Sequence, residues 1–313
     1  MYEKNYAILR EIVETDGVIR HVSKHRNPDG TLDITGNKKI WNNAIAKFQQ
    51  IKLWESGTPN FDPEADPLQS EPSIIFIPAQ GTKEKHGTII VAHGGGFNLR
   101  TGCEGMNVAY WFANAGFNTA ILTYRIEPYT RFDAIDDMQR AIRLLRARRD
   151  ELGITDKVVV MGFSAGGMLG GNCATHYDLG RSGAEDVIEQ HSCRPDAAVV
   201  CYGAFAPLSF PGGMFRSLFK GTREQQYYLS VEHNVTCDTP PFFIWQTYSD
   251  DARNAFALGS ALSAAGVPFE MHVFPDGFHG LALADGHNDL AMDIPHVAHW
   301  ADLCAEWLQG LEI

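Results

Sequence analysis

The chain has 313 residues with 44% hydrophobic content, which is enough for one large core. Its formal net charge is −12 and no basic cluster stands out, so nucleic acid is not expected as a partner. No apolar run approaches the ~20 residues of a membrane helix, and residues 1–20 lack the apolar stretch of a signal peptide. The six cysteines are scattered without CxxC pairs. We therefore expect a cytoplasmic protein with reduced thiols and no membrane partner, whose oligomeric state is left open.

The chain divides into two parts. Residues 1–50 are expected to form an N-terminal extension that is partly helical, with short helices over 6–13 and 37–51. Residues 51–313 alternate strands with helices after a loop at 57–72, which predicts one α/β domain with a mostly parallel sheet and helices on both faces. The expected strands are 73–77, 88–92, 118–123, 157–162, 197–202, 242–247 and 269–274. The expected helices are 104–115, 133–149, 165–177, 252–265 and 295–309.

Residues 204–236 interrupt this alternation with a segment rich in proline, glycine and aromatic side chains, among them Phe210, Phe215 and Phe219. Long irregular loops are usually functional or disordered. The segment is predicted either to form a small cap over a binding site or to make a surface excursion that packs on its own aromatics.

The most informative motif is Gly162-Phe163-Ser164-Ala165-Gly166, which follows the apolar run Val158–Met161 and precedes a predicted helix. A Gly-x-Ser-x-Gly turn between a strand and a helix is typical of a nucleophile elbow, in which the serine is exposed at a strained turn. The glycines at 162 and 166 allow close passage of the neighbouring backbone. Ser164 is therefore the predicted catalytic nucleophile rather than a serine in a structural turn.

A glycine triplet follows the predicted strand 88–92, in the sequence His93-Gly94-Gly95-Gly96-Phe97. Such a loop leaves backbone N–H groups free to point at an anion. We expect Gly95, Gly96 and the backbone of Ala165 to stabilise an oxyanion, and Glu104 to order this loop. The alternative for the triplet is a simple flexible turn.

Two further segments supply the partners that a serine nucleophile needs. His279 follows the last predicted strand in a glycine-rich loop and is the predicted general base, with His287 as its competitor. Asp250 and Asp251 follow the strand 242–247. Asp250 is the predicted orienting acid, with Asp251 as the alternative acid or as an N-cap of the next helix. The chain order Ser, Asp, His is that of α/β-hydrolases.

Three other polar features have structural interpretations. Arg125 follows a strand and is expected to form a salt bridge rather than to bind an acidic substrate. Asp136 and Asp137 lie near the start of a predicted helix and are interpreted as capping residues. No metal-ligand pattern includes His93, and no cofactor is expected.

In combination, these motifs resemble those of α/β-hydrolase esterases related to acetyl-xylan esterases and other acetylesterase or lipase-like (BD-FAE-like) enzymes. The resemblance covers about residues 70–313. It includes the segments 93–97, Glu104-Gly105, 122–125, 162–167, 229–232 through 240–242, and 279–281. The acid loop Asp250-Asp251-Ala252-Arg253-Asn254 is shorter than the Asp-x-x-Val-Pro pattern of these relatives. The hormone-sensitive-lipase branch is a poorer match because its D-P-L-x-D motif is absent.

The sequence therefore predicts a cofactor-independent serine esterase that acts on a small-molecule ester through an acyl-enzyme. The resemblance implies small acyl groups, acetyl above all, on carbohydrates or similar alcohols. Two alternatives stand beside this prediction: a general carboxylesterase or lipase-like hydrolase of other small esters, and a catalytically inactive binding protein on the same fold.

Overall fold

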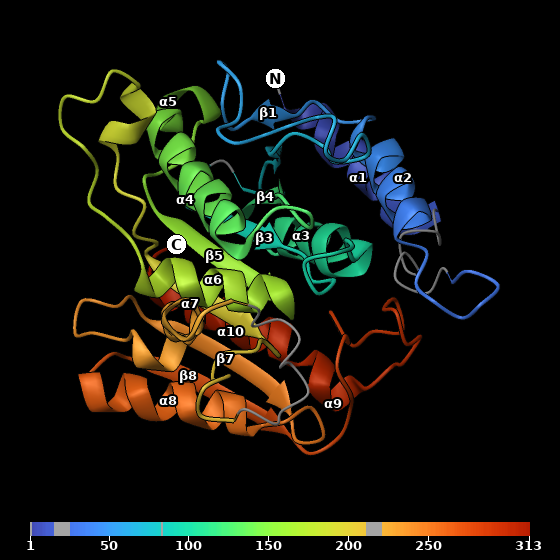
Figure 1. Cartoon of the computed structure of the whole chain (residues 1–313), viewed down its shortest axis with the longest axis vertical. Helices are drawn as coiled ribbons and strands as arrows, with labels where there is room; N and C mark the ends of the chain where they lie inside the picture. Colours follow the sequence, from blue (N-terminus) through green and yellow to red (C-terminus); the bar gives the residue numbers. More distant parts are fainter. Residues whose placement is uncertain (1, 16–25, 83, 211–220) are drawn as a thin grey trace.

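The computed structural model describes residues 2–15, 26–82, 84–210 and 221–313. Its centre is an eight-stranded sheet with the order β1-β2-β4-β3-β5-β6-β7-β8 (Figure 1). The strands are β1 Ile51–Lys52, β2 Ser73–Ile77, β3 Thr88–Ala92, β4 Asn118–Thr123, β5 Val158–Phe163, β6 Ala197–Cys201, β7 Phe242–Thr247 and β8 Phe269–Phe274. The neighbouring strands β4, β3, β5, β6, β7 and β8 are parallel, whereas β1 and β2 are antiparallel to their neighbours. The predicted mostly parallel sheet is confirmed.

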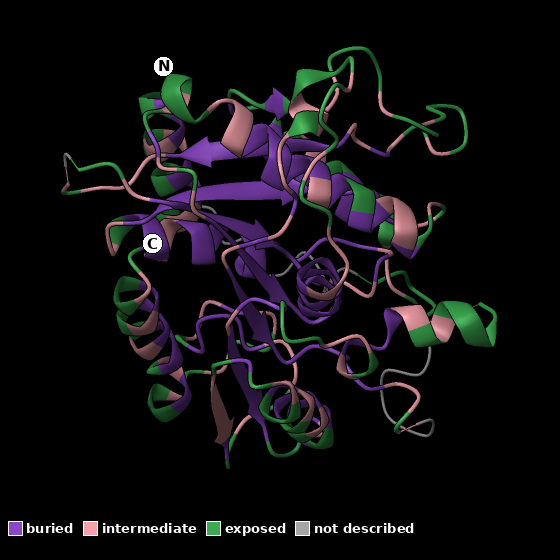
Figure 2. Ribbon diagram, turned by 90° about the vertical axis from the view of Figure 1, so that its left-hand side faces the viewer, coloured by how far each residue is buried: buried purple, intermediate pink, exposed green. Residues whose placement is uncertain are grey.

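Helices cover both faces of this sheet, and the alternation of side chains along each strand explains why. In β5, Val158 and Val160 belong to one core, with α4 (131–147), α6 (165–175) and α8 (253–265) (Figure 1). Val159 and Met161 belong to the other, with α1 (3–15), α2 (34–45), α3 (108–114) and α10 (300–310). Because successive side chains of a strand point to opposite faces, a sheet covered on both sides needs continuous apolar strands. Figure 2 shows these central strands as buried and the outer helix faces as exposed.

The described helices fall into those two layers and into shorter pieces between strands. The longer α-helices are α1 Glu3–Thr15, α2 Ile34–Ile45, α3 Val108–Asn114, α4 Arg131–Ala147, α6 Ala165–Thr175, α7 Arg223–Leu229, α8 Arg253–Ala265 and α10 Trp300–Gly310. The short ones are α5 Arg149–Leu152, α9 Pro295–Ala298, the π-helical turn η2 Cys103–Asn107, and the 3₁₀ turns η3 Val187–Gln190 and η5 Val231–His233. Among the described residues, no helix is long and apolar enough to cross a membrane.

The N-terminal residues pack directly on the sheet. Leu9 and Ile12 of α1 and Trp41 of α2 are buried in the same core as β3. The amide of Asn5 donates to the Phe76 carbonyl of β2 at 3.0 Å. The predicted helix 37–51 ends earlier, at Ile45, because Ile51 pairs with Ile74 as an additional edge strand.

The start of α4 corrects one interpretation. Thr130 is the N-cap and forms a capping box with Asp133, so Asp136 and Asp137 do not cap this helix. Asp137 is fully buried and its carboxylate instead binds the guanidinium of Arg125 at 2.7 Å. Arg125, only 1% exposed, therefore has the structural salt bridge that we expected.

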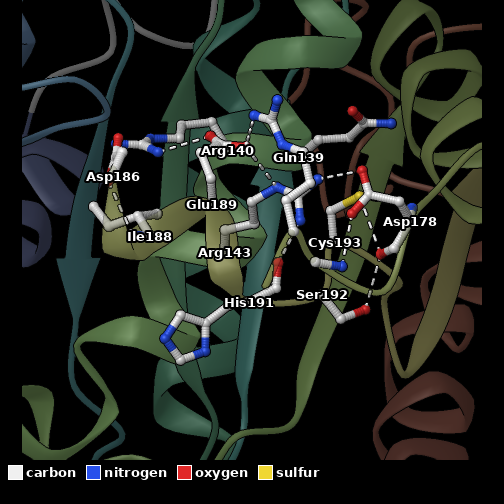
Figure 3. A network of polar contacts seen from close by, with 12 residues as sticks. Gln139, Arg140, Arg143, Asp178, Asp186, Ile188, Glu189, His191, Ser192 and Cys193 are labelled. Atoms are coloured by element: carbon white, nitrogen blue, oxygen red, sulfur yellow. Dashed lines mark hydrogen bonds and ion pairs between the residues drawn. The ribbon is translucent and has the colours of Figure 1, made fainter. Parts of the chain in front are cut away.

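The long connection from α6 to β6, residues 176–196, is fixed to α4 by ion pairs (Figure 3). Arg140 binds Asp186 at 2.6 Å and Glu189 at 2.7 Å. One turn further along α4, Arg143 binds Asp178 at 2.6 Å. Residues three or four apart lie on the same face of a helix, so Arg140 and Arg143 both face the connection and bind it at separate points.

The segment 204–236 is described only in its flanks. Phe215 and Phe219 lie outside the described residues. On the C-terminal side, Asn172 of α6 donates to the Leu229 carbonyl at 3.3 Å, and Val231 packs beside Gly171 of α6. On the N-terminal side, the Phe210 ring lies 4.8 Å from the guanidinium of Arg253. Both flanks thus pack along α6 and α8, on the first of the two core faces.

Candidate active site

Ser164 occupies the turn between β5 and α6 with a left-handed backbone (φ 53°, ψ −115°). The flanking glycines are required by close backbone contacts. A Cβ at Gly162 would lie 1.9 Å from the Gly166 carbonyl oxygen, and one at Gly166 would lie 2.2 Å from the Ala92 carbonyl oxygen. A non-glycine residue in this backbone region is strained, and such strain is typical of functional sites. The motif therefore folds as the strand–turn–helix predicted for an elbow.

The loops after β7 and β8 bring two more of the predicted residues to this serine. Ser164 Oγ lies 2.7 Å from His279 Nε2, and His279 Nδ1 lies 2.7 Å from Asp250 Oδ2. The hydroxyl of Ser249 donates to the Gly277 carbonyl, which joins the two loops. The three side chains form one continuous hydrogen-bonded line from the elbow to the end of β7.

Asp250 is completely buried, whereas the His279 side chain is 30% exposed. Burial raises the pKa of the Asp250 carboxyl, and the hydrogen bond from His279 opposes this rise. Ser164 itself is 8% exposed. The acid end of the line is thus screened from water, and His279 is its most exposed member.

Asp251 points away from this line. Its carboxylate binds the Arg253 guanidinium in a two-pronged pair, at 2.5 and 2.9 Å. Its interpretation as the N-cap of the next helix is wrong, because α8 has Ala252 at the N-cap and no side-chain cap bond. Asp251 has a left-handed backbone (φ 51°), and its carboxylate and that of Asp250 bind different partners, Arg253 and His279.

The glycine triplet passes directly beside the serine. A Cβ at Gly94 would lie 2.9 Å from Ser164 Cβ, and one at Gly95 (φ 110°) would lie 2.1 Å from the Leu99 carbonyl oxygen. The Gly94 N–H donates to Glu104 Oε2 at 2.8 Å. For the N–H groups of Gly95, Gly96 and Ala165, no acceptor is found within the described ranges. An N–H group without a protein acceptor can donate to an anion, and Gly94 brings this loop against Ser164.

Tyr202, which the sequence analysis did not single out, joins the glycine loop to the histidine loop. Its hydroxyl donates to Glu104 Oε1 at 2.9 Å and accepts the Ala282 N–H at 2.9 Å. Its ring packs edge-on against His279 with a centroid distance of 5.1 Å. Burial raises the pKa of Tyr202 well above its ordinary value, so its hydroxyl stays protonated. In the sequence, Tyr202 is hidden as the last residue of an apolar strand pattern.

His93, the first residue of the glycine motif, is fully buried between aromatic rings. Its ring stacks on Tyr124 at 4.5 Å and meets the edge of Trp41 at 4.9 Å. Burial lowers the pKa of His93 to about 3, so the imidazole is neutral. It packs between these rings beside the glycine loop, and its Nδ1 lies 2.7 Å from the Gly94 carbonyl oxygen.

His287, the alternative base, lies on the wall of a separate surface hollow together with Asn107 and Tyr110. Its backbone carbonyl accepts the Asn107 amide at 3.2 Å, which fixes it beside η2. His279, not His287, is the histidine that the structure brings to Ser164.

Comparisons with known proteins agree with this fold. The BD-FAE family model matches residues 74–205. Endo-1,4-beta-xylanase B from Butyrivibrio fibrisolvens is 29% identical over 90% of the chain. The chain spans 45% of that relative's length.

Among solved structures, the acetyl ester-xyloside bifunctional hydrolase from Caldicellulosiruptor lactoaceticus is 33% identical, with a TM-score of 0.76. That match covers 84% of this chain and 96% of the hydrolase. A carboxylesterase from Lactobacillus plantarum WCFS1 is 22% identical over 77% of this chain and 94% of its own, with a TM-score of 0.63, and shares the fold. The chain therefore belongs to the α/β-hydrolase esterases, which are carboxylic ester hydrolases.

Proposed function

We propose that this protein hydrolyses short-chain esters, principally acetyl esters of carbohydrates, through a Ser164–His279–Asp250 triad. The observation that carries the proposal is the unbroken hydrogen-bonded line from Ser164 to Asp250, beside free N–H groups of a glycine loop. The acetyl and carbohydrate parts are supported by the Caldicellulosiruptor lactoaceticus relative, an acetyl ester-xyloside hydrolase, and by the xylanase relative.

In the first half of the reaction, Ser164 Oγ attacks the ester carbonyl carbon and His279 Nε2 takes the serine proton. The carbonyl oxygen becomes an oxyanion, which the N–H groups of Gly95, Gly96 and Ala165 stabilise. The intermediate collapses to an acyl-serine, and the alcohol leaves with the proton from His279. The distance of 2.7 Å between Oγ and Nε2 permits direct proton transfer.

In the second half, a water molecule gives a proton to His279 Nε2 and attacks the acyl carbon. A second oxyanion forms at the same N–H groups, and its collapse returns the proton to Ser164 Oγ and releases the carboxylic acid. Asp250 holds the proton on Nδ1 throughout, so that Nε2 is the lone-pair nitrogen that faces Ser164. The positive charge that develops on the imidazole is stabilised by the adjacent buried carboxylate.

The test is hydrolysis of nitrophenyl esters from acetyl to decanoyl by the wild type and by Ser164→Ala. We expect the acetyl ester to have the highest kcat/KM, with a steep fall beyond butyryl, and the variant to lose a factor of about 10³ or more in kcat. A serine-directed phosphonate should label the wild type at Ser164. Near-normal turnover by Ser164→Ala would refute the mechanism, and a preference for octanoyl would favour a lipase-like enzyme instead.

A further inference from the structure

A hollow of about 580 Å³ lies between the end of α1, helix α3 and the segment that follows His279. Its wall includes the aromatic rings of Tyr110 and Trp111 and the carboxylates of Glu14 and Asp285. The volume is within the range of small-molecule sites, and an aromatic wall with a few polar groups is typical of such sites.

A second hollow, of about 340 Å³, adjoins the first. The two share Trp111, Leu283 and Asp285 as a common wall, and the second continues to Asp293 and to Asp302 of α10. The two adjoining hollows are here called together the Trp111 groove. Two adjoining hollows can hold separate units of one extended ligand.

The groove is acidic. Four carboxylates lie along it, from Glu14, Asp285, Asp293 and Asp302, and no lysine or arginine is among its described lining residues. Anionic ligands are therefore disfavoured. Carboxylate oxygens accept hydrogen bonds from hydroxyl groups, and an aromatic face packs against the C–H face of a sugar ring. A neutral chain of sugar units satisfies both kinds of contact.

The groove is close to the catalytic residues. Leu283, in the shared wall, follows His279 by only four residues, which span at most about 14 Å. The connection is held in place, because the Ala282 N–H donates to the Tyr202 hydroxyl, whose ring contacts His279. On its other wall, Asn107 donates to the His287 carbonyl at 3.2 Å. The short segment from His279 to His287 thus links the Ser164 site to the wall of the groove.

We infer that the Trp111 groove binds the unreacted sugar units of an acetylated, neutral oligosaccharide, one of whose esters enters the Ser164 site. This inference rests on the proposed function. The sugar units make contacts distant from the reacting carbonyl, and such contacts raise kcat/KM for a long substrate without any effect on a small one.

The first experiment measures binding without catalysis. Calorimetry measures the binding of unsubstituted xylohexaose to three proteins. One is the Ser164→Ala variant, and the other two combine Ser164→Ala with either Trp111→Ala or Asp285→Asn. Each added substitution is expected to weaken binding by on the order of tenfold. Matched controls are Phe256→Ala, on the exposed side of α8, and Asp150→Asn, a carboxylate that is 87% exposed. Thermal unfolding verifies that each variant is folded.

The second experiment compares two substrates in the active enzyme. With Trp111→Ala and Asp285→Asn, kcat/KM for acetylated xylo-oligosaccharide should fall by the same factor as binding, while that for nitrophenyl acetate stays unchanged. Unchanged binding and unchanged kcat/KM in folded variants would overturn the inference, as would tight binding of spermine in place of xylohexaose. A wild type that binds xylohexaose but hydrolyses no acetyl ester would refute the proposed function alone.

Discussion

At the scale of single residues, two consecutive aspartates have different environments, and only Asp250 is bound to His279. Asp250 is fully buried against His279, whereas Asp251 binds Arg253, whose side chain is 58% exposed. Buried charges that lose a partner are costly, and exposed ion pairs contribute little. A substitution at Asp250 therefore removes the group that orients His279, whereas the same substitution at Asp251 only removes a carboxylate.

We predict that Asp250→Asn lowers kcat by about 10³-fold or more, because the amide favours the wrong tautomer of His279. Asp251→Asn is the matched control. It keeps a residue that tolerates a left-handed backbone and loses only a surface pair, so turnover should stay near that of the wild type and stability should change by less than about 1 kcal/mol. Kinetics and thermal unfolding measure both effects. The reverse pattern would assign the acid to Asp251.

Tyr202 offers a second residue-scale test. Tyr202→Phe removes the hydroxyl that joins Glu104 to the Ala282 N–H, and so leaves two buried polar groups unpaired. Because Glu104 also holds the Gly94 N–H, we expect the oxyanion donors to shift, with kcat lowered roughly 10- to 100-fold and KM little changed. The control is Tyr227→Phe, a tyrosine 51% exposed on α7. A loss of stability without a loss of kcat would leave Tyr202 a structural role only.

At the scale of elements, α4 is tied to the connection between α6 and β6 by its arginines (Figure 3). Arg140 is 4% exposed, binds Asp186 and Glu189, and also donates to the Leu53 carbonyl at 2.8 Å. It therefore holds three segments that are distant in sequence. Losing it leaves the Glu189 carboxylate, which is 20% exposed, without this partner.

We predict that Arg140→Ala lowers the free energy of unfolding by roughly 1–3 kcal/mol, because it removes a buried guanidinium whose partners Asp186 and Glu189 are 46% and 20% exposed. Arg149→Ala, on α5 with a side chain 51% exposed, should cost less than about 1 kcal/mol. Urea unfolding of both variants measures the difference. Equal losses would show that burial of Arg140 adds nothing to the stability of this layer.

The elements also show what the sequence could predict. Apolar strands such as β3 and β7 have the bounds that were expected, because a doubly covered strand needs a continuous apolar run. The predicted helix 295–309 is instead divided into α9 and α10 on either side of His299. The π-helical start of the predicted helix 104–115 was not expected either. Periodicity reports the buried face of a helix and not the local backbone that tertiary contacts impose.

At the scale of the whole molecule, motifs could bring Ser164, His279 and Asp250 together because each lies in the turn or loop that follows a strand. The carboxyl ends of parallel strands meet at one edge of the sheet. Tyr202 could not be found in this way, since its role depends on Glu104 and Ala282, which lie far from it in sequence. The Trp111 groove is hidden for the same reason, because α1, α3 and the segment after His279 form it jointly. The cytoplasmic location stays a prediction from the sequence.

The last prediction concerns the stability of the whole fold in acid. Burial lowers the pKa of His93 from an ordinary value of 6.5 to about 3, so the folded protein keeps this imidazole neutral where the unfolded chain protonates it. The unfolded state then binds more protons, and stability is lost as pH falls from about 6.5 towards 3. The loss attributable to His93 is about 1.4 kcal/mol for each pH unit in this window.

His93→Phe keeps a ring against Tyr124 and Trp41 but has no titrating group. We expect this variant to be less stable than the wild type at pH 7, because the Gly94 carbonyl loses its partner at 2.7 Å. Its unfolding free energy should nevertheless fall less steeply than that of the wild type as the pH is lowered. Below pH 6.5, the difference in unfolding free energy between the two proteins should shrink by about 1.4 kcal/mol for each pH unit. Urea unfolding at half-unit intervals from pH 7 to 4 gives both curves. Parallel curves would mean that His93 takes up its proton at the same pH in the folded and the unfolded protein. They would contradict the conclusion that burial keeps this imidazole neutral in the folded state.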